Sequence, residues 1–248
     1  MVVFVIVLGV LFVWVRGNGG PSGSGSSTVT PGVATGPVTA STPLSADRGH
    51  VVFTDNFRDS NSGWKKTSVT GATYTYANGA YNDTGSGLYV YFASSPYREP
   101  HQQLSVSIKA NLSPNAPVDA GIGVGCGRGS GSTELRYELI VFVDGSWTVQ
   151  RRNGVPSDTG APITLKDGSS ATAAGSTPVT VVGVCATLSD GHTTRIALFI
   201  DGTLAVDLTD TATTLADSGW IGSILLAASD AKTTTMTVSR VEERDIAA

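Results

Sequence analysis

Apolar and polar residues alternate over much of the chain after about residue 50, which is the pattern of β-strands that pack one face on a core. The segment 134–142 places its apolar residues on one side: Leu135, Tyr137, Leu139 and Val141. The same alternation recurs at 146–152, 195–201 and 233–241. No long stretch keeps the i, i+3, i+4 apolar spacing of a helix. The pattern therefore predicts an all-β domain.

Three dipeptides predict tight hairpin turns: Asn78-Gly79, Asp144-Gly145 and Asp201-Gly202. Such pairs readily adopt the positive φ angles that short hairpins require. Because most connections would then be hairpins, we expect antiparallel sheets. Two stacked sheets would bury the roughly 12 to 14 half-apolar segments, more than a minimal immunoglobulin domain contains. The prediction is a two-sheet jelly-roll sandwich over residues 49–248.

The first 16 residues form a separate apolar segment. Residues 1–15 carry no charge, and Arg16 follows them. As a helix, 15 residues reach about 22 Å, short of the roughly 30 Å hydrocarbon core of a bilayer. A signal peptide would need a basic start and a small-residue cleavage site, which this segment lacks. We therefore expect an uncleaved N-terminal membrane helix, with a signal peptide or a buried element of the domain as alternatives.

Residues 17–48 are predicted to be a flexible linker. Gly, Ser, Pro and Thr dominate, and residues 17–46 contain no charged or aromatic side chain. Such a segment cannot bury enough apolar surface to offset its ordering entropy. Linkers of this kind often tether exported domains, although a tail without function is the alternative. We expect a single-pass membrane protein whose C-terminal domain lies outside the cytoplasm; a secreted protein is the alternative.

A series of sequence phrases keeps a fixed order between residues 51 and 243. VVFTDNFRDSNSGW and the hairpin YTYANGAY come first, followed by AGIGVGCGR, YELIVFVDGSWTVQR and IALFIDGTLAVDLTD. This order resembles the concanavalin A-like, or laminin-G-like, jelly-roll domains of exported, membrane-anchored actinobacterial proteins. The resemblance implies a jelly-roll fold and a role in ligand binding or sensing. It does not imply a particular activity.

Two cysteines, Cys126 and Cys185, lie in separate apolar segments. An exported protein would normally oxidise such a pair. Both follow a Val-Gly or Gly-Val step, so neighbouring positions in the core are expected. We predict a disulfide, and two buried thiols are the alternative.

The sequence contains no recognised catalytic motif. Jelly-roll glycosidases use a Glu-x-Asp-x-x-Glu strand that places carboxylates across the sugar, and no such strand is present. Glu134 and Glu138 share a face, but the intervening Arg136 indicates a solvated, charge-balanced stripe. Phosphate-binding, serine-nucleophile and zinc-ligand motifs are also missing from the sequence. We therefore expect no enzymatic activity, and a glycoside hydrolase-like enzyme with an unrecognised site is a third alternative.

Asp55, Asp59 and Asn61 cluster near the start of the domain. Hard oxygen ligands suit calcium, and jelly-roll domains often hold one structural ion. The spacing is not that of an EF-hand. The alternative is a polar turn capped by Asp and Asn side chains.

Aromatic side chains are the candidate ligand contacts because sugar rings present apolar C–H faces. The candidates are Trp64, Tyr97, Trp147 and Trp220. Core packing is the alternative for Trp64 and Trp147. Tyr97 lies in a polar segment that suits a binding site better.

The net charge of −4 and the lack of a basic cluster argue against binding to nucleic acid or anionic lipid. We expect a membrane-tethered, non-catalytic binding or sensing module whose partner is a glycan or a cell-wall component. The alternative is a structural spacer or envelope-assembly protein that binds no small ligand.

Overall fold

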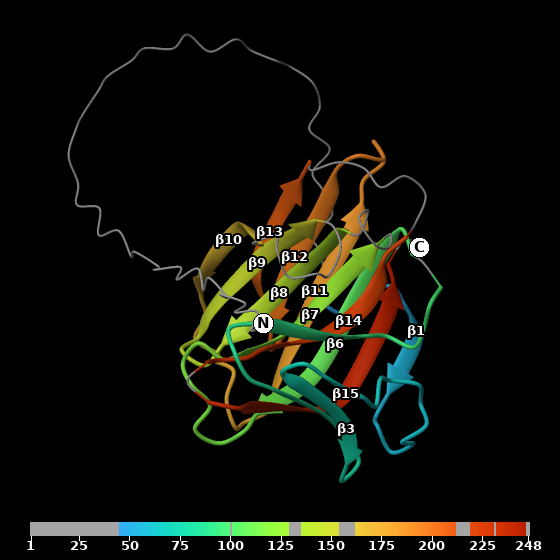
Figure 1. Ribbon diagram of the computed structural model, residues 1–248. Helices are drawn as coiled ribbons and strands as arrows, with labels where there is room; N and C mark the ends of the chain where they lie inside the picture. The colour runs from blue at the N-terminus through green and yellow to red at the C-terminus, as the bar shows by residue number, and fades with distance from the viewer. Residues whose placement is uncertain are drawn as a thin grey trace, which may run out of the picture. The chain divides into compact units, whose positions relative to one another are not determined.

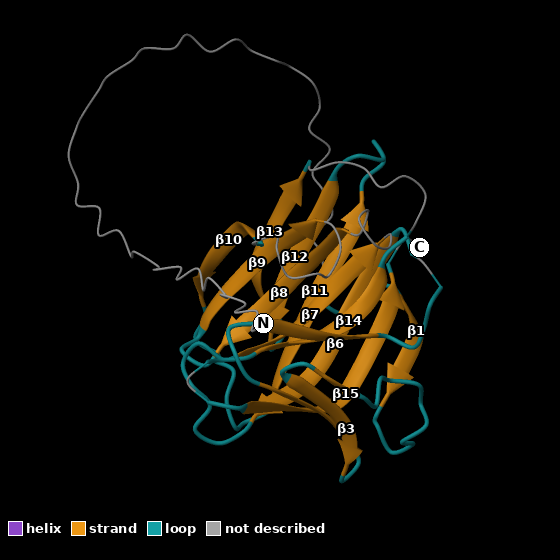
Figure 2. Cartoon of the chain, viewed as in Figure 1, coloured by secondary structure: helices purple, strands orange, loops and turns teal. Residues whose placement is uncertain are grey.

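The computed structural model describes residues 45–99, 101–128, 135–153, 162–211, 219–230 and 232–246. Within these ranges the chain consists of strands, turns and loops, without a helix (Figure 2). No helix in this part of the chain is long and apolar enough to cross a membrane. The predicted anchor, 1–16, lies outside the described residues, as does the predicted linker up to residue 44.

Nine antiparallel strands form one sheet: β1 (His50–Asp55), β2 (Ser68–Val69), β3 (Ala72–Ala77), β4 (Ala80–Gly85), β6 (Gln103–Leu112), β11 (Val179–Thr187), β12 (Thr194–Ile200), β13 (Thr203–Asp210) and β15 (Thr234–Asp245). Their order is β13-β12-β11-β6-β15-β4-β3-β2. The long β15 pairs with β4 through its first half and with β1 through its second. The opposite edge of β15 pairs with β6. β15 therefore connects strands β13, β12, β11 and β6 with strands β4, β3, β2 and β1.

Six antiparallel strands form the second sheet: β5 (Val90–Ser94), β7 (Gly121–Arg128), β8 (Leu135–Phe142), β9 (Ser146–Asn153), β10 (Ile163–Ser169) and β14 (Ile221–Ala227). Their order is β10-β9-β8-β7-β14-β5. Four of them, β7 to β10, are neighbours in both sequence and space. They form a meander whose outer face positions the polar groups described below.

The two sheets pack face to face (Figure 1), with β7 of the six-stranded sheet against β6 and β11 of the other. The alternation predicted for β8 is confirmed, because Tyr137, Leu139 and Val141 are fully buried between the sheets. The all-β, two-sheet antiparallel fold is therefore confirmed. The side chains of the intervening residues of β8 lie on the outer face of the six-stranded sheet.

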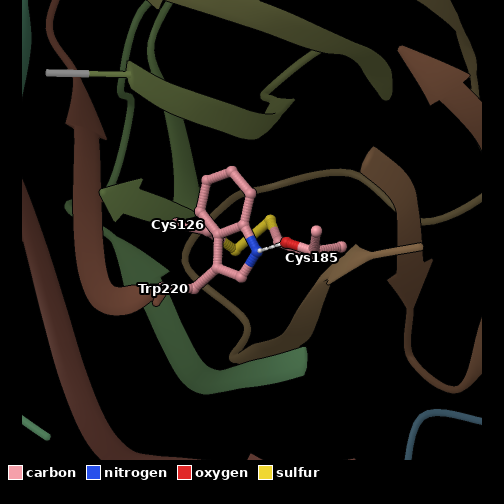
Figure 3. Close-up of a disulfide and its surroundings, with 4 residues drawn as sticks. Cys126, Cys185 and Trp220 are labelled. Atoms are coloured by element: carbon pink, nitrogen blue, oxygen red, sulfur yellow. Dashed lines mark hydrogen bonds between the residues drawn. A yellow bond between two sulfur atoms is a disulfide. The ribbon is translucent and has the colours of Figure 1, made fainter. Parts of the chain in front are cut away.

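The predicted disulfide is also confirmed, since Cys126 of β7 is bonded to Cys185 of β11. The bond joins the two sheets inside the core, where both residues are fully buried. Figure 3 shows the Trp220 ring beside it, with the indole N–H donating to Thr187 Oγ1 at 3.1 Å. The alternative of two reduced thiols is thereby excluded for this structure.

The three predicted hairpins connect β3 to β4, β8 to β9 and β12 to β13. Asn78-Gly79 and Asp201-Gly202 have positive φ at both residues, as a two-residue hairpin turn requires. The third turn differs: only Gly145 has positive φ, and Asp144 Oδ1 instead accepts the Ser146 N–H at 2.8 Å. All three hairpins form, by two different turn geometries.

Candidate functional site

The three tryptophans proposed as ligand contacts lie in the core. Trp64 is 2 % exposed, Trp147 6 % and Trp220 0 %. Trp64 packs among Phe57 and Tyr81, and Trp220 packs against Tyr137. A ring that is buried to this extent cannot contact a sugar at the protein surface. Trp64 and Trp147 therefore lie where the core-packing alternative puts them, and Trp220, for which no such alternative was given, is buried as well.

Tyr97 is partly exposed, and its ring stacks with two neighbours. The interplanar angle is 17° with Phe53 and 14° with His101. His101 Nδ1 lies 3.1 Å from Asp245 Oδ2, which fixes the imidazole. The Tyr97 hydroxyl donates to Glu99 at 3.0 Å. The ring and the hydroxyl of Tyr97 are thus engaged within the protein.

The three candidate calcium ligands use their oxygens within the protein. Asp55 is 8 % exposed and accepts the Phe57 N–H at 2.7 Å and the Trp64 indole N–H at 2.9 Å. Asp59 Oδ1 accepts the Asn61 N–H at 2.8 Å, while Asn61 Oδ1 accepts from a lysine. Among the described residues, no group of three or more His, Cys, Asp or Glu is arranged to hold a metal ion. The geometry is that of a capped polar turn.

A hollow of about 340 Å³ lies beside this turn, lined by Thr54, Asp55, Asn56 and Arg240. It contains polar groups but no aromatic ring. Two of its members are already engaged, because Asp55 caps the turn and Arg240 donates to Glu242 at 2.7 Å. The polar groups of this hollow would orient a ligand, but the hollow has no apolar side chain on which a ring could stack.

The outer face of the six-stranded sheet is divided by a strand of glycines. The residues of β7 on this face are glycines: Gly123, Gly125 and Gly127. They pair in that order with Ile140, Glu138 and Arg136 of β8. On the β5–β14 side the face is apolar, with Leu225, Ala227, Val90 and Phe92 packed together. On the β8–β10 side it is polar. Because Gly123, Gly125 and Gly127 leave this face of β7 without side chains, the Arg136 guanidinium reaches across to the Phe92 ring, 4.0 Å from its centroid.

A buried ion cluster forms the centre of the polar side. Glu138 Oε1 accepts from Arg136 Nε at 3.0 Å and from Arg152 Nε at 3.1 Å. Its second oxygen accepts from Gln150 Nε2 at 2.5 Å. The Glu138 side chain is 0 % exposed, whereas that of Arg152 is 24 % exposed. The stripe predicted to be solvated is therefore a buried network, because β9 brings two further partners over the carboxylate.

Accessible polar groups surround this cluster. Thr148 of β9 pairs with Asp167 of β10, and Gln150 pairs with Thr164. Thr164 and Asp167 are exposed, and Thr148 is half-buried. We call these residues, with Arg136, Glu138, Gln150 and Arg152, the β8–β10 polar face. Its hydroxyl, carboxylate and guanidinium groups are carried on three paired strands of one sheet.

No protein-family model and no curated protein matches this sequence. Solved structures do match. A galectin-like protein of unknown function from Bacillus subtilis has a TM-score of 0.56 at 9 % identity, over 80 % of this chain and 97 % of that one. The fold is thus that of galectin-like jelly-roll sandwiches.

Two further structures connect this fold with carbohydrate. A glycoside hydrolase family 16 protein from Bacteroides ovatus, in complex with a mixed-linkage glucan product, has a TM-score of 0.53 at 7 % identity, over 77 % of this chain and 99 % of that one. The carbohydrate recognition domain of Emp47p has a TM-score of 0.50 at 11 % identity, over 82 % and 99 %. At these identities the likeness establishes the fold. It agrees with the fold implied by the sequence resemblance.

One sequence expectation is corrected by these structures. We expected no enzymatic activity because the chain lacks a Glu-x-Asp-x-x-Glu strand. The similar structures include family 16 glycoside hydrolases as well as a recognition domain, so this fold carries catalysis as well as binding. A missing strand motif was too narrow a criterion, because it tests one catalytic arrangement only.

Sequence reasoning missed the polar face itself. Arg136 and Glu138 are two residues apart, but Gln150 and Arg152 come from the next strand. The available signal was the hairpin at Asp144-Gly145, which sets the register of β8 against β9. Counting residue pairs across a two-residue turn would have placed Glu138 opposite Arg151, whereas the three-residue connection between Phe142 and Ser146 places it opposite Gln150.

Proposed function

We propose that this domain binds a carbohydrate on the β8–β10 polar face. The observation that carries the proposal is the set of fixed polar groups on an outer sheet face of a fold shared with a carbohydrate recognition domain. Exposed Thr164 and Asp167 supply direct contacts, and partly exposed Arg152 supplies a guanidinium already oriented by Glu138. Orientation in advance reduces the entropy lost on binding.

The experiment is retention of the full chain on a glycan array and on insoluble polysaccharides. The test variant is the double substitution Thr164→Ala/Asp167→Ala, which leaves the ion cluster intact. The matched control is Asp207→Ala/Thr209→Ala, on exposed positions of the edge strand β13 in the other sheet. We expect the first pair to weaken binding and the second to leave it unchanged. Equal binding by both variants, or no retention of the wild type, would contradict the proposal.

Hydrolysis of the bound glycan is a second candidate, favoured by the family 16 structures. Glycoside hydrolysis generally uses two carboxyl groups that flank the scissile bond. On the described part of the polar face these are Glu138 and Asp167. Release of reducing ends from a bound polysaccharide by the wild type, at a rate that falls more steeply in Glu138→Gln than retention does, would establish it. Polysaccharide that is unchanged after long incubation would show that the domain binds glycan without hydrolysing it.

The cellular location is proposed on chemical grounds. A disulfide in the core is typical of an oxidising compartment. The apolar segment 1–15 and the uncharged linker would tether the domain to a membrane outside the cytoplasm. Membrane fractionation of cells expressing the full chain, followed by protease treatment of intact cells, tests this. Recovery of the chain in the soluble cytoplasmic fraction would contradict it.

A further inference from the structure

Tyr89 is exposed to an extent that sets it apart from the other aromatic residues. Eight large apolar side chains in the described ranges are exposed by a third or more: Val51, Val69, Leu88, Tyr89, Val118, Ile163, Leu188 and Leu204. Tyr89 is the aromatic member of this group and is 59 % exposed. Every tryptophan in the described ranges is buried, and the Tyr97 ring already stacks with Phe53 and His101. If this domain stacks a ring against a sugar, Tyr89 is the residue placed to do so.

The position of the Tyr89 ring is fixed by its neighbours. Gly87 has φ of +87°, and a Cβ there would lie 2.9 Å from Tyr89 Cδ2, so the ring lies directly against the glycine. Tyr91 packs beside it, with ring centroids 6.0 Å apart and an interplanar angle of 56°. The Tyr91 hydroxyl is itself held by the Ser86 carbonyl oxygen at 2.6 Å. The exposed ring is therefore held in place before any ligand arrives.

The backbone around Tyr89 is equally constrained. The Tyr89 N–H donates to the Gly87 carbonyl oxygen at 2.8 Å, and the Tyr89 carbonyl oxygen accepts the Ala228 N–H at 2.9 Å. The Gly87 N–H donates to the Ser229 carbonyl oxygen at 3.0 Å. These bonds tie the turn before β5 to the segment after β14. A rigid aromatic side chain with two rotatable bonds loses little entropy when a ligand stacks on it.

We infer that Tyr89 is the stacking contact for a sugar ring that presents its apolar C–H face. The inference rests on the proposed carbohydrate function and assigns a contact outside the β8–β10 polar face. The two segments that hold Tyr89 also carry exposed polar residues, Ser86 and Asp230. An aromatic platform with a few polar neighbours is the composition of a sugar subsite rather than of an extended apolar protein interface.

The strand order separates Tyr89 from Thr164 and Asp167, whereas Arg136 of the polar face reaches Phe92 of β5. Tyr89 precedes β5 at one edge of the six-stranded sheet, and β9 and β10 form the other edge. Four strand spacings between β9 and β5 amount to roughly 19 Å. One sugar ring cannot contact both areas. Contributions from Tyr89 and from Thr164 and Asp167 are therefore separable.

The experiment measures affinity of the full chain for the glycan that best retains the wild type, in the variants Tyr89→Ala, Tyr89→Phe and Leu88→Ala. Leu88 is the matched control because it is the adjacent, 70 % exposed apolar residue. We expect Tyr89→Ala to weaken binding roughly 3- to 10-fold, the range of an aromatic stacking contact. Tyr89→Phe should keep most of the affinity, since the ring remains, and Leu88→Ala should keep it as well.

The outcomes separate this inference from the proposed function. Wild-type affinity in Tyr89→Ala, together with weaker binding in Thr164→Ala/Asp167→Ala, overturns the Tyr89 contact and leaves the proposed function standing. Equal losses in Tyr89→Ala and Leu88→Ala also overturn it, because a general apolar contact would then explain both. A wild type that no glycan retains overturns both proposals. Folding of each variant is checked by the reversibility and midpoint of its thermal unfolding.

Discussion

Cys126 and Cys185 join the two sheets of the sandwich through a disulfide between β7 and β11. The two residues are 59 positions apart, so the bond closes a long loop in the unfolded chain. The disulfide thereby ties the two sheets together at β7, the strand that carries Gly123, Gly125 and Gly127. This relationship gives the first of four stability tests.

Removal of the disulfide should lower the free energy of unfolding by roughly 4 kcal/mol, because the unfolded chain regains the entropy of a loop of this length. Urea unfolding of the Cys126→Ala/Cys185→Ala variant measures the loss. Dithiothreitol should destabilise the wild type and leave the double variant unchanged. Labelling of both native cysteines by iodoacetamide would contradict the bond.

A methyl group at Gly123 should destabilise the fold, whereas one at Gly127 should not. A Cβ at Gly123 would meet the Leu139 carbonyl oxygen at 2.2 Å, too close for strands β7 and β8 to keep their pairing. At Gly127 the nearest atom is 4.0 Å away. We expect Gly123→Ala to cost on the order of 2 kcal/mol and Gly127→Ala well under 1 kcal/mol. Thermal unfolding of the pair decides, and equal midpoints would refute the close approach of β7 to β8.

Asp83 should make stability fall as the pH rises from about 4 to about 7. Its side chain is fully buried on β4, and neither carboxylate oxygen has a hydrogen-bond partner. Burial raises its pKa from 3.8 to about 7, with Lys65 opposing the shift. The folded-state pKa of Asp83 lies above its unfolded-state pKa. Its contribution to the free energy of unfolding is therefore fully present below about pH 4 and is lost as the pH rises to about 7.

Asp83→Asn should accordingly raise the unfolding temperature at pH 8 and change it much less at pH 4. Asp190 is the control with the opposite sign, because hydrogen bonds from Thr193 and His192 lower its pKa to about 2. Asp190→Asn should therefore be destabilising at neutral pH. Burial also raises the pKa of Glu243 to about 7, so part of the pH dependence should persist in Asp83→Asn. A flat wild-type profile between pH 4 and 8 would contradict the assignment.

Asp55→Ala should be markedly more destabilising than Asp59→Ala. Asp55 satisfies a buried indole N–H and the N–H of Phe57, whose φ of 58° is rare for a bulky residue. Loss of both bonds should cost roughly 2–5 kcal/mol, whereas the exposed turn bond of Asp59 should cost about 1 kcal/mol or less. Chemical unfolding with and without calcium chloride measures both effects. A calcium-dependent rise in the wild type alone would support the calcium prediction.

The strand pattern was predictable because it is local. Side chains two residues apart on a strand face the same way, so the alternation at 135–141 reports a buried face wherever the strand lies. Hairpin turns depend on two adjacent residues, which is why Asn78-Gly79 and Asp201-Gly202 were found with both φ angles positive. The disulfide partner was predictable for a simpler reason: the chain contains only two cysteines.

The site was not predictable in the same way. Trp64, Trp147 and Trp220 have the residue type that sugar sites use, but neighbours from distant parts of the chain bury them. The charge stripe on β8 looked solvated because Gln150 and Arg152 belong to the next strand. In each case the sequence specified the side chain, and packing between segments set its exposure.

By itself, then, the sequence determined the strands, three hairpins, the cysteine pair and a domain of two antiparallel sheets. Only the tertiary structure decided which polar groups meet on the outer face of the six-stranded sheet and which aromatic ring stays in solvent. The physical reason is range. Periodicity and turn chemistry act over a few residues, whereas burial at Trp220 or exposure at Tyr89 depends on strands that become neighbours only when the sheets close.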